Sequence, residues 1–517
     1  MNLLFVTRQL GLVLLVLSLS LLAVGGWSAA QAMTGVSAET EAAKALVVTV
    51  VFGAILGCVL WWSGRGGPVQ LGRREAMLLV ATSWLLGAGL AAVPYFIWAC
   101  LTHDAHPGHP FANPIDCYFE AMSGLTTTGA TVLGHDGHMI EQLPRGLLLW
   151  RSLTQWLGGL GIVVLFVAVL PTLGVGGKRL FRVESPGPAA PGVRPRIGQT
   201  ARALWLIYLT LTLVEVLALW LAGASFFDAL CHTFTTLATG GFSTRDSSAG
   251  GESPAIQIIL IVFMILGGIN FGLYYHLTRG RFRQVWTNTE LRFYIGLLAV
   301  ATMIVVITIL NRPLATTAAP NQPVKAAAGQ ALLHGAFQVV SIQTGTGFCT
   351  ANFDTWGFTA DAVFLALMFV GASAGSTGGG IKVIRILIMV KVFIAELERA
   401  FRPNVVRTVK VGNAVVNLDH RISTLVYILG IVVLFIVGAV LLMWFESSAD
   451  CTFRTAATAS AATLNNIGPG LGRVGAIENY GWFSGPSKVL LSLLMVLGRL
   501  ELFAILVLLS PRFWRGE

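Results

Sequence analysis

The chain has 517 residues, of which 55% are hydrophobic and only 11% are charged, with a formal net charge of +10 and a mean hydropathy of +0.75. Soluble domains carry about 25% charged residues, so this composition excludes an ordinary soluble protein and predicts an integral membrane protein. The positive charge does not indicate nucleic-acid binding, because it gathers in a few loops between apolar segments.

Ten apolar stretches are long enough to span a bilayer, which takes about 20 residues each. In chain order they lie near 3–26, 44–63, 76–101, 146–171, 201–223, 255–277, 292–311, 360–395, 422–445 and 486–511. The first stretch also resembles a secretory signal peptide, because WSAAQA follows it. Its apolar run is long for a signal peptide and only Arg8 precedes it, so we expect a retained helix paired with the second stretch.

The distribution of Lys and Arg predicts the orientation. These residues gather near 65–74, 178–196, 279–283 and 399–421, in loops on the same side as the N-terminus, and are sparse in the other loops. Cytoplasmic loops of membrane proteins carry such an excess of positive charge. The sequence therefore predicts a multi-pass protein with both termini in the cytoplasm.

Four outer segments interrupt the apolar pattern with Thr and Gly. They read TTTGATV, ATGGFST, QTGTGFCT and TLNNIGPGLG, and their central glycines are Gly129, Gly240, Gly347 and Gly468. The separations of 111, 107 and 121 residues indicate internal duplication. A mostly apolar run of 11–15 residues precedes each segment. Such runs are too short to span, so they predict helices that re-enter the membrane from outside.

The predicted repeats carry two further signals. Asp116, Asp228 and Asp450 lie near the start of three short helices, either as N-caps, which we favour, or as groups that attract cations. The span after each loop contains a glycine motif, and these motifs are WLGGLG, LGGINFG, VGASAGSTGGG and LGRLEL. Glycines at matching depth allow helices to approach closely.

The Thr/Gly segments suit the passage of a monovalent cation. Non-helical backbone at membrane depth is tolerated only where it is buried in protein or lines a water-filled path. Four such loops around one axis present rings of carbonyl oxygens that replace the hydration shell of a cation. Thr hydroxyls add ligands, and the short helices direct their negative C-terminal ends at the axis. The loops lack the carboxylates expected for divalent cations.

The motifs TTTGAT, ATGGFST, TGTGF, NNIGPG, GASAGSTGGGIK and GRLEL together resemble those of the Trk/Ktr/HKT superfamily of potassium transporters. The resemblance covers nearly the whole chain, and the additional N-terminal helix pair is similar to the TrkH type. It implies potassium uptake across the inner membrane of a bacterium. It also implies a homodimer, with one pore in each protomer and contact with membrane lipid, and a cytoplasmic nucleotide-binding regulatory subunit of the TrkA type.

The resemblance further implies a selectivity filter with one glycine from each loop and potassium bound among the loop residues. The residues that match are Thr127, Thr128, Gly129, Thr239, Gly240, Thr346, Gly347, Asn466, Ile467 and Gly468. The fourth loop lacks the Thr-x-Gly form, so strict fourfold symmetry is excluded and we expect modest discrimination against sodium. Plant relatives that transport sodium have serine at the position of Gly129. The glycine found here therefore favours potassium.

Two features predict a gate on the inner side of the filter. The segment SAGSTGGGIK interrupts the eighth span, and each glycine there costs a helix about 1 kcal/mol relative to alanine. We therefore expect unwound backbone that acts as a gate, or alternatively a packing kink. Arg499 lies near the middle of the last span, where it either faces the pore or pairs with Glu501 or Glu215. The gate candidates are Gly371, Gly375, Gly378, Gly379, Gly380, Lys382 and Arg499, although Lys382 is also able to reach the inner interface.

The predicted fold is an all-α polytopic membrane protein with four pseudo-symmetric helix–pore loop–helix repeats around a central pore. The predicted units are an N-terminal helix pair at 1–70 and repeats at 71–185, 186–285, 286–405 and 406–517. Two alternatives remain: a sodium or non-selective cation transporter of the same fold, and a polytopic membrane transferase. The second is disfavoured because the distinctive positions are neutral Thr and Gly rather than acids, bases or metal ligands.

Overall fold

The computed structural model describes residues 2–35, 38–66, 72–134, 138–159, 161, 197–404, 408–412, 414–447, 449 and 451–515. Asp450 and the basic loop at 178–196 lie outside these residues, as does nearly all of the predicted span 146–171 beyond Gly159. The boundary predicted between the first and second repeats also lies outside them.

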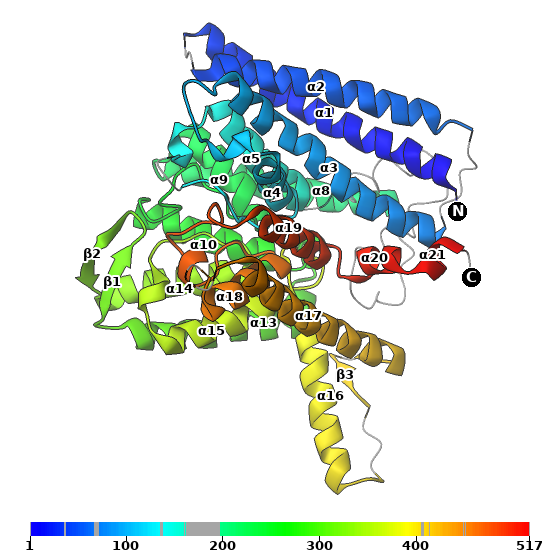
Figure 1. The fold of residues 1–517 in the computed structure, drawn as a ribbon. Coiled ribbons are helices and arrows are strands. Elements are labelled where there is room, and N and C mark those ends of the chain that lie inside the picture. The colour runs from blue at the N-terminus through cyan, green and yellow to red at the C-terminus, as the bar shows by residue number, and fades with distance from the viewer. Residues whose placement is uncertain are drawn as a thin grey trace.

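The N-terminal part of the chain is a helix pair packed on a third long helix. α1 (Leu3–Met33) and α2 (Ala38–Ser63) lie side by side, and α3 (Arg73–Leu101) packs against both (Figure 1). Gly11 and Gly57 let α1 and α2 approach closely, because a β-carbon on Gly11 would collide with the Gly57 carbonyl oxygen. The predicted helix pair is present.

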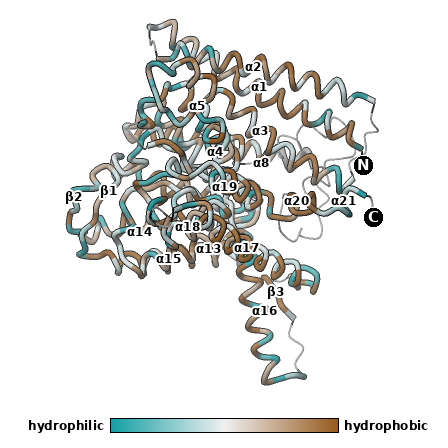
Figure 2. Tube along the Cα trace, viewed as in Figure 1, coloured by the Kyte–Doolittle hydropathy of each residue, from teal (hydrophilic) through white to brown (hydrophobic). Residues whose placement is uncertain are grey.

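Three other unbroken helices have the length and apolar character of membrane spans. They are α8 (Ile197–Leu221), α13 (Thr289–Ile309) and α17 (Leu418–Phe445), which with α1, α2 and α3 make six among the described residues. Apolar residues dominate these helices (Figure 2). Many of their large apolar side chains are exposed, as expected for surfaces that face lipid rather than water.

Other predicted spans are broken rather than continuous. α10 (Pro254–Gly268) meets α11 (Phe271–Thr278) at 94°, and α19 (Gly485–Arg499) meets α20 (Phe503–Leu506) and η6 (Val507–Leu509) at 112°. The sequence analysis did not predict the bends in these two spans, 255–277 and 486–511. The eighth predicted span consists of α15 (Phe358–Phe369) and α16 (Val383–Phe401), with non-helical backbone between them. This interruption was predicted from the glycines at 371–380.

Four short helices stand before the Thr/Gly loops, as predicted. They are α4 (Pro114–Leu125), α9 (Phe226–Leu237), α14 (Ala328–Thr344) and α18 (Phe453–Leu464). The predicted N-caps are wrong, because the capping side chains come from Asn113, Ser225 and Thr452. Asp116 and Asp228 lie in the first turn of their helices instead. α5 (Arg145–Gly159) follows the first loop.

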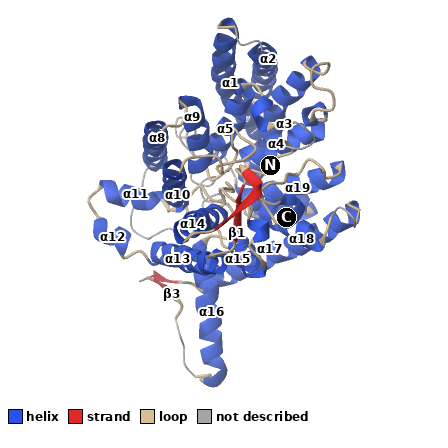
Figure 3. Ribbon diagram, turned by 90° about the vertical axis from the view of Figure 1, so that its left-hand side faces the viewer, coloured by secondary structure: helices blue, strands red, loops and turns tan. Residues whose placement is uncertain are grey.

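The remaining elements are short. They are η1 (Pro110–Ala112), η2 (Ile140–Gln142), η4 (Phe353–Thr355), η5 (Gly472–Val474), α12 (Phe282–Trp286), α21 (Pro511–Arg515) and the antiparallel strand pairs β1 (Pro313–Thr316) with β2 (Ala319–Lys325) and β3 (Lys410–Val411) with β4 (Ala414–Val415). The two chain ends lie on one side, opposite β1 and β2 (Figure 1), and α16 projects from the bundle. Figure 3 shows loops gathered at the centre of the surrounding helices.

Candidate functional site

The four Thr/Gly loops share one backbone conformation. In each, a residue with left-handed backbone stands two positions before a glycine that also has positive φ. The four pairs, with their φ angles, are Thr127 (53°) and Gly129 (81°), Thr239 (55°) and Gly241 (77°), Gly345 (80°) and Gly347 (85°), and Asn466 (55°) and Gly468 (93°). Non-glycine residues rarely adopt left-handed backbone and do so mainly at functional sites. We call residues 126–130, 238–242, 344–348 and 465–469 the four glycine loops.

The four glycine loops close into a ring through contacts between glycines and carbonyl groups. A β-carbon on any of the four glycines would lie within 2.7 Å of a carbonyl oxygen in another loop. Gly129, Gly241, Gly347 and Gly468 would meet the oxygens of Gly240, Thr346, Ile467 and Thr128, respectively. Only glycine allows this approach, because any side chain would displace the neighbouring loop.

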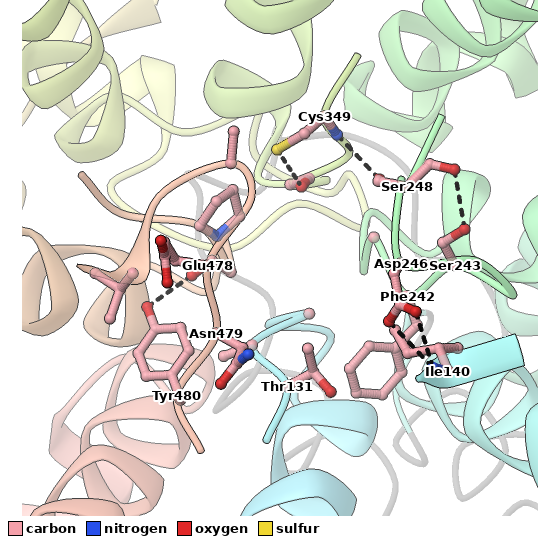
Figure 4. Close-up of a pocket in the computed structure, with 18 of the residues that line it drawn as sticks. Thr131, Ile140, Phe242, Ser243, Asp246, Ser248, Cys349, Glu478, Asn479 and Tyr480 are labelled. Carbon is pink, nitrogen blue, oxygen red and sulfur yellow. Dashed lines mark hydrogen bonds between the residues drawn. The ribbon is translucent and has the colours of Figure 1, made fainter. Parts of the chain in front are cut away.

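This ring corrects the predicted alignment of the second loop by one residue. The sequence analysis matched Gly240 to Gly129 when the repeats were aligned. In the structure it is Gly241 that has the positive φ and the contact with a carbonyl oxygen of the next loop. Gly240 takes the position of Thr128, Thr346 and Ile467. One pocket is lined by all four glycines of the corrected pattern, which are Gly129, Gly241, Gly347 and Gly468 (Figure 4 shows residues around it).

The polar side chains of the ring are buried, and some of them are hydrogen-bonded to one another. Thr127, Thr128, Thr239, Thr346 and Asn466 are all fully buried. The Asn466 Nδ2 group donates to Thr128 Oγ1 over 3.0 Å, which joins the fourth loop to the first. The hydroxyls of Thr128 and Thr346 each lie 2.8 Å from the Thr hydroxyl two residues earlier. The hydroxyls of Thr128 and Thr346 therefore help to hold the loops, whereas Thr127 Oγ1 has no hydrogen-bond partner among the described residues.

Two residues that the sequence did not single out also hold the ring. Gln155, on α5, donates from Nε2 to the Gly240 carbonyl over 2.8 Å and accepts from the Phe242 amide over 3.1 Å. The Tyr480 hydroxyl donates to the Gly468 carbonyl over 2.7 Å (Figure 4). Gln155 and Tyr480 belong to no sequence motif. Only their contacts in the folded protein show that they hold the ring.

The predicted glycines after each loop bring three helices, and the non-helical backbone between α15 and α16, against the ends of the short helices. A β-carbon on Gly158, Gly267, Gly378 or Gly498 would lie within 3.2 Å of the last carbonyl oxygen of α4, α9, α14 or α18, respectively. The prediction that these glycines permit close approach is confirmed. The contacts fix the carboxyl ends of the short helices, where the helix dipole is negative, beside the ring.

The segment 370–382 lies directly beneath the ring. A β-carbon on Gly379 would collide with Asn465 and Asn466 of the fourth glycine loop. Thr377 Oγ1 donates to the Leu237 carbonyl over 2.8 Å, which ties the segment to the end of α9. Glu290 accepts from the Ala374 amide over 2.7 Å. Lys382 is buried and donates to the Gly378 carbonyl. Its side chain therefore does not extend to the inner interface, which was the alternative placement.

Arg499 joins the segment to another helix end. Its guanidinium donates to the carbonyls of Thr377 over 2.8 Å, Gly158 over 2.5 Å and Gly159 over 3.0 Å. The prediction that Arg499 sits inside a continuous span is wrong, because α19 ends at this residue. Glu501, one of the two acids considered as its partner, lies 2.6 Å from Arg385 of α16 and has left-handed backbone, with φ of 55°.

Carboxylates lie at the pocket lined by the four glycines, and beside it. Asp246 accepts from the Ile140 amide over 3.1 Å (Figure 4), and Glu141 accepts from the Asp246 amide over 3.0 Å. Burial, together with the neighbouring Glu141 carboxylate, raises the pKa of Asp246 to about 7, against the opposing effects of the Ile140 amide and Arg151. Asp246 therefore loses its negative charge as the pH around it falls through 7.

We expect cation uptake to decline as the outer pH falls from 8 to 6. Removing one negative charge raises the energy of a cation about 4 Å away by about 1 kcal/mol in water. This energy corresponds to a decrease of up to about fivefold in the local concentration of the cation. Initial rates of uptake at fixed inner pH measure this. Asp246→Asn should give the low-pH rate throughout, and an unchanged pH profile in that variant would assign the dependence to another group.

Known proteins of the same fold share this arrangement of helices. A family model described as "TrkH: Cation transport protein" matches residues 42–515. The Trk system potassium uptake proteins TrkH of Salmonella typhimurium and Escherichia coli K12 are each 37% identical to the chain over 515 residues, 99% of this chain and 99% of those proteins. The crystal structure of the potassium transporter TrkH from Vibrio parahaemolyticus matches with a TM-score of 0.83 at 33% identity, covering 100% of both chains. The chain belongs to the TrkH family of cation transport proteins.

Proposed function

We propose that this chain takes up potassium across the bacterial inner membrane through a pore whose selectivity filter is the ring of glycine loops. The family consists of transporters and not enzymes, which removes the transferase alternative. The observation that carries the proposal is the closed ring of Gly129, Gly241, Gly347 and Gly468. Four buried loops of this kind offer carbonyl oxygens in place of a hydration shell.

Potassium is the cation we propose, with sodium transport by the same fold as the second candidate. The relatives named above are potassium uptake proteins. The oxygen ligands expected from Thr127, Thr128, Thr239, Thr346, Asn466 and Ile467 are neutral, and each repeat contributes one ring glycine. The weaker symmetry of the fourth loop, which carries Asn and Ile in place of Thr, leads us to expect only moderate discrimination against sodium.

We further propose that the segment 370–382 and Arg499 form the inner gate. The segment lies under the fourth glycine loop, and an arginine bound to Thr377 adds positive charge on the inner side. The glycines at 371, 375, 378, 379 and 380 give it freedom to move aside. Lys382 belongs to this gate as a group that holds the segment through Gly378.

The wider assembly follows from the family resemblance and from the positive loops. We propose a homodimer surrounded by lipid, with a cytoplasmic nucleotide-binding subunit of the TrkA type that acts on the gate. The projecting helix α16 begins directly after the segment 370–382 (Figure 1). A subunit that moves α16 would therefore also move this segment. The four repeats and the N-terminal pair at 1–70 are proposed as the units of the pore, with both termini in the cytoplasm.

Ion flux into liposomes tests this function. Vesicles that contain the purified protein should accumulate potassium down its gradient faster than empty vesicles do. They should accumulate sodium more slowly under a gradient of the same size. The same measurement with and without a pH gradient separates channel-like passage from proton coupling. Equal fluxes of the two ions would favour the non-selective alternative, and the absence of flux in protein that is folded would contradict the proposal.

A further inference from the structure

One buried ion pair, between Glu120 and Arg151, lies beside the glycine loops. Glu120, on α4, is fully buried, and Arg151, on α5, is 1% exposed. Arg151 Nη2 lies 2.7 Å from Glu120 Oε1, and Arg151 Nε donates to the same oxygen over 2.9 Å. Placing two charges in the protein interior carries a large desolvation cost. The presence of this ion pair therefore indicates a role other than filling space in the core.

Glu120 holds the outer part of the first glycine loop. Its carboxylate accepts from Thr131 Oγ1 over 2.9 and 3.1 Å and from the Val132 amide over 3.0 Å. Val132 stands three residues after the ring glycine Gly129, so the carboxylate fixes the chain just as it leaves the ring.

Arg151 extends the same contact to the second loop. Its Nη1 donates to the Ser243 carbonyl over 3.2 Å, and its Nη2 donates to Thr131 Oγ1 over 3.3 Å. The guanidinium carbon lies 4.2 Å from the ring centre of Phe242, a cation–π contact. Because Phe242 directly follows the ring glycine Gly241, one arginine touches the outer ends of both loops.

The third and fourth loops hold the equivalent amide with neutral groups. In the third loop, Gln338 Oε1 accepts from the Thr350 amide over 3.2 Å. In the fourth loop, Thr458 Oγ1 accepts from the Leu471 amide over 2.9 Å. Thr350 and Leu471 each stand three residues after a ring glycine, as Val132 does. A neutral acceptor is therefore sufficient to hold one loop, and the charge on Glu120 serves the link to Arg151.

We propose that Glu120 and Arg151 are positioning residues that fix the first two glycine loops relative to each other and so set the preference for potassium over sodium. This proposal rests on the proposed function of the ring. A ring held at a fixed width favours one ion size, whereas loops that move independently adapt to a smaller ion.

Three variants test the pair in full-length protein reconstituted into liposomes. Glu120→Gln copies the neutral acceptor of the third loop but leaves Arg151 as an unpaired buried charge, so we expect low thermal stability. Glu120→Gln with Arg151→Met removes both charges and should recover stability without recovering selectivity. Thr131→Val keeps the ion pair and removes only the hydroxyl that both members contact.

The measurement is the potassium-to-sodium permeability ratio, with the thermal midpoint recorded for each variant. For the double variant we expect the ratio to fall about tenfold, which corresponds to about 1.4 kcal/mol, and for Thr131→Val a smaller fall in the same direction. Asp361→Asn is the matched control, because it breaks an ion pair with Arg454 away from the first two loops. It should keep the ratio of the unmodified protein.

The outcomes separate the two proposals. If unmodified protein shows no preference for potassium, the proposed function fails and the role of the pair fails with it. If unmodified protein is selective and both the double variant and Thr131→Val fold and keep its ratio, the role of the pair alone is overturned. If the double variant does not fold, Thr131→Val decides by its ratio. A loss of thermal stability with an unchanged ratio identifies the pair as merely structural.

Discussion

Replacing Arg499 with alanine is expected to increase the leak of potassium through the pore in the absence of any regulator. A cation that leaves the ring inward must pass the segment 370–382, to which the Arg499 guanidinium is bound through Thr377. A fixed positive charge about 4 Å from the path raises the energy of the cation by about 4 kcal/mol at an effective dielectric constant near 20. Basal flux into liposomes measures the change, which should exceed tenfold even if only about 1.4 kcal/mol of this barrier is realised.

A deletion of Ser376–Gly379 should have the same effect by a different route. It removes part of the backbone beneath the ring, together with the Thr377 carbonyl to which Arg499 donates. If the regulatory subunit acts through the segment, the deletion should also blunt the response to that subunit, whereas Arg499→Ala should retain part of it. Comparing the two variants with and without the subunit therefore separates the charge from the moving element.

Arg454→Ala is the control for the loss of an arginine, since Arg454 lies in ion pairs with Asp354 and Asp361 at α18 and not at the segment. It should leave basal flux unchanged. Should Arg499→Ala and the deletion both fold and conduct no faster than the unmodified protein, the gate lies elsewhere. Arg499 would then have a structural role, through its hydrogen bonds to the carbonyls of Thr377, Gly158 and Gly159.

The sequence contained enough information to predict the main elements of this site. Clustered Thr and Gly in otherwise apolar surroundings indicated non-helical backbone, because several adjacent glycines lower the stability of a helix. The short helices and the interruption of the eighth predicted span followed from length and from the cost of glycine in a helix. All of these are local properties of the chain, which a single sequence records directly.

What the sequence did not predict depends on contacts between distant residues. The breaks near Asn270 and Leu502 lie within apolar stretches. Leu502 has left-handed backbone, with φ of 64°, which cannot be predicted from the preferences of leucine. Glu120 and Arg151 are 31 positions apart, and Arg151 reaches Ser243 over 92 positions. Their pairing is a property of the folded ring. Single buried polar residues look alike in a sequence whether or not they hold a loop.

The one-residue shift in the second loop has the same origin, and it yields the second large expected effect. ATGGF offers two adjacent glycines, and composition cannot distinguish them. The structure does so through φ, which is positive at Gly241 but not at Gly240, and through contact. A β-carbon on Gly241 would collide with the Thr346 carbonyl oxygen, whereas one on Gly240 would meet the side chain of Gln155. A backbone carbonyl in the ring has less freedom to yield than the end of a side chain.

Gly241→Ala and Gly129→Ser are therefore expected to abolish most of the preference for potassium, with a fall of about tenfold or more in the permeability ratio to sodium. Gly240→Ala should have a clearly smaller effect. Gly280→Ala is the control for backbone strain alone, because Gly280 has positive φ of 69° but no atom near the position of a β-carbon, so it should keep the ratio. Paired potassium and sodium fluxes in liposomes, with thermal midpoints, decide the matter. A larger effect at Gly240 than at Gly241 would restore the original alignment, and normal selectivity in folded Gly129→Ser and Gly241→Ala would remove the ring from the filter altogether.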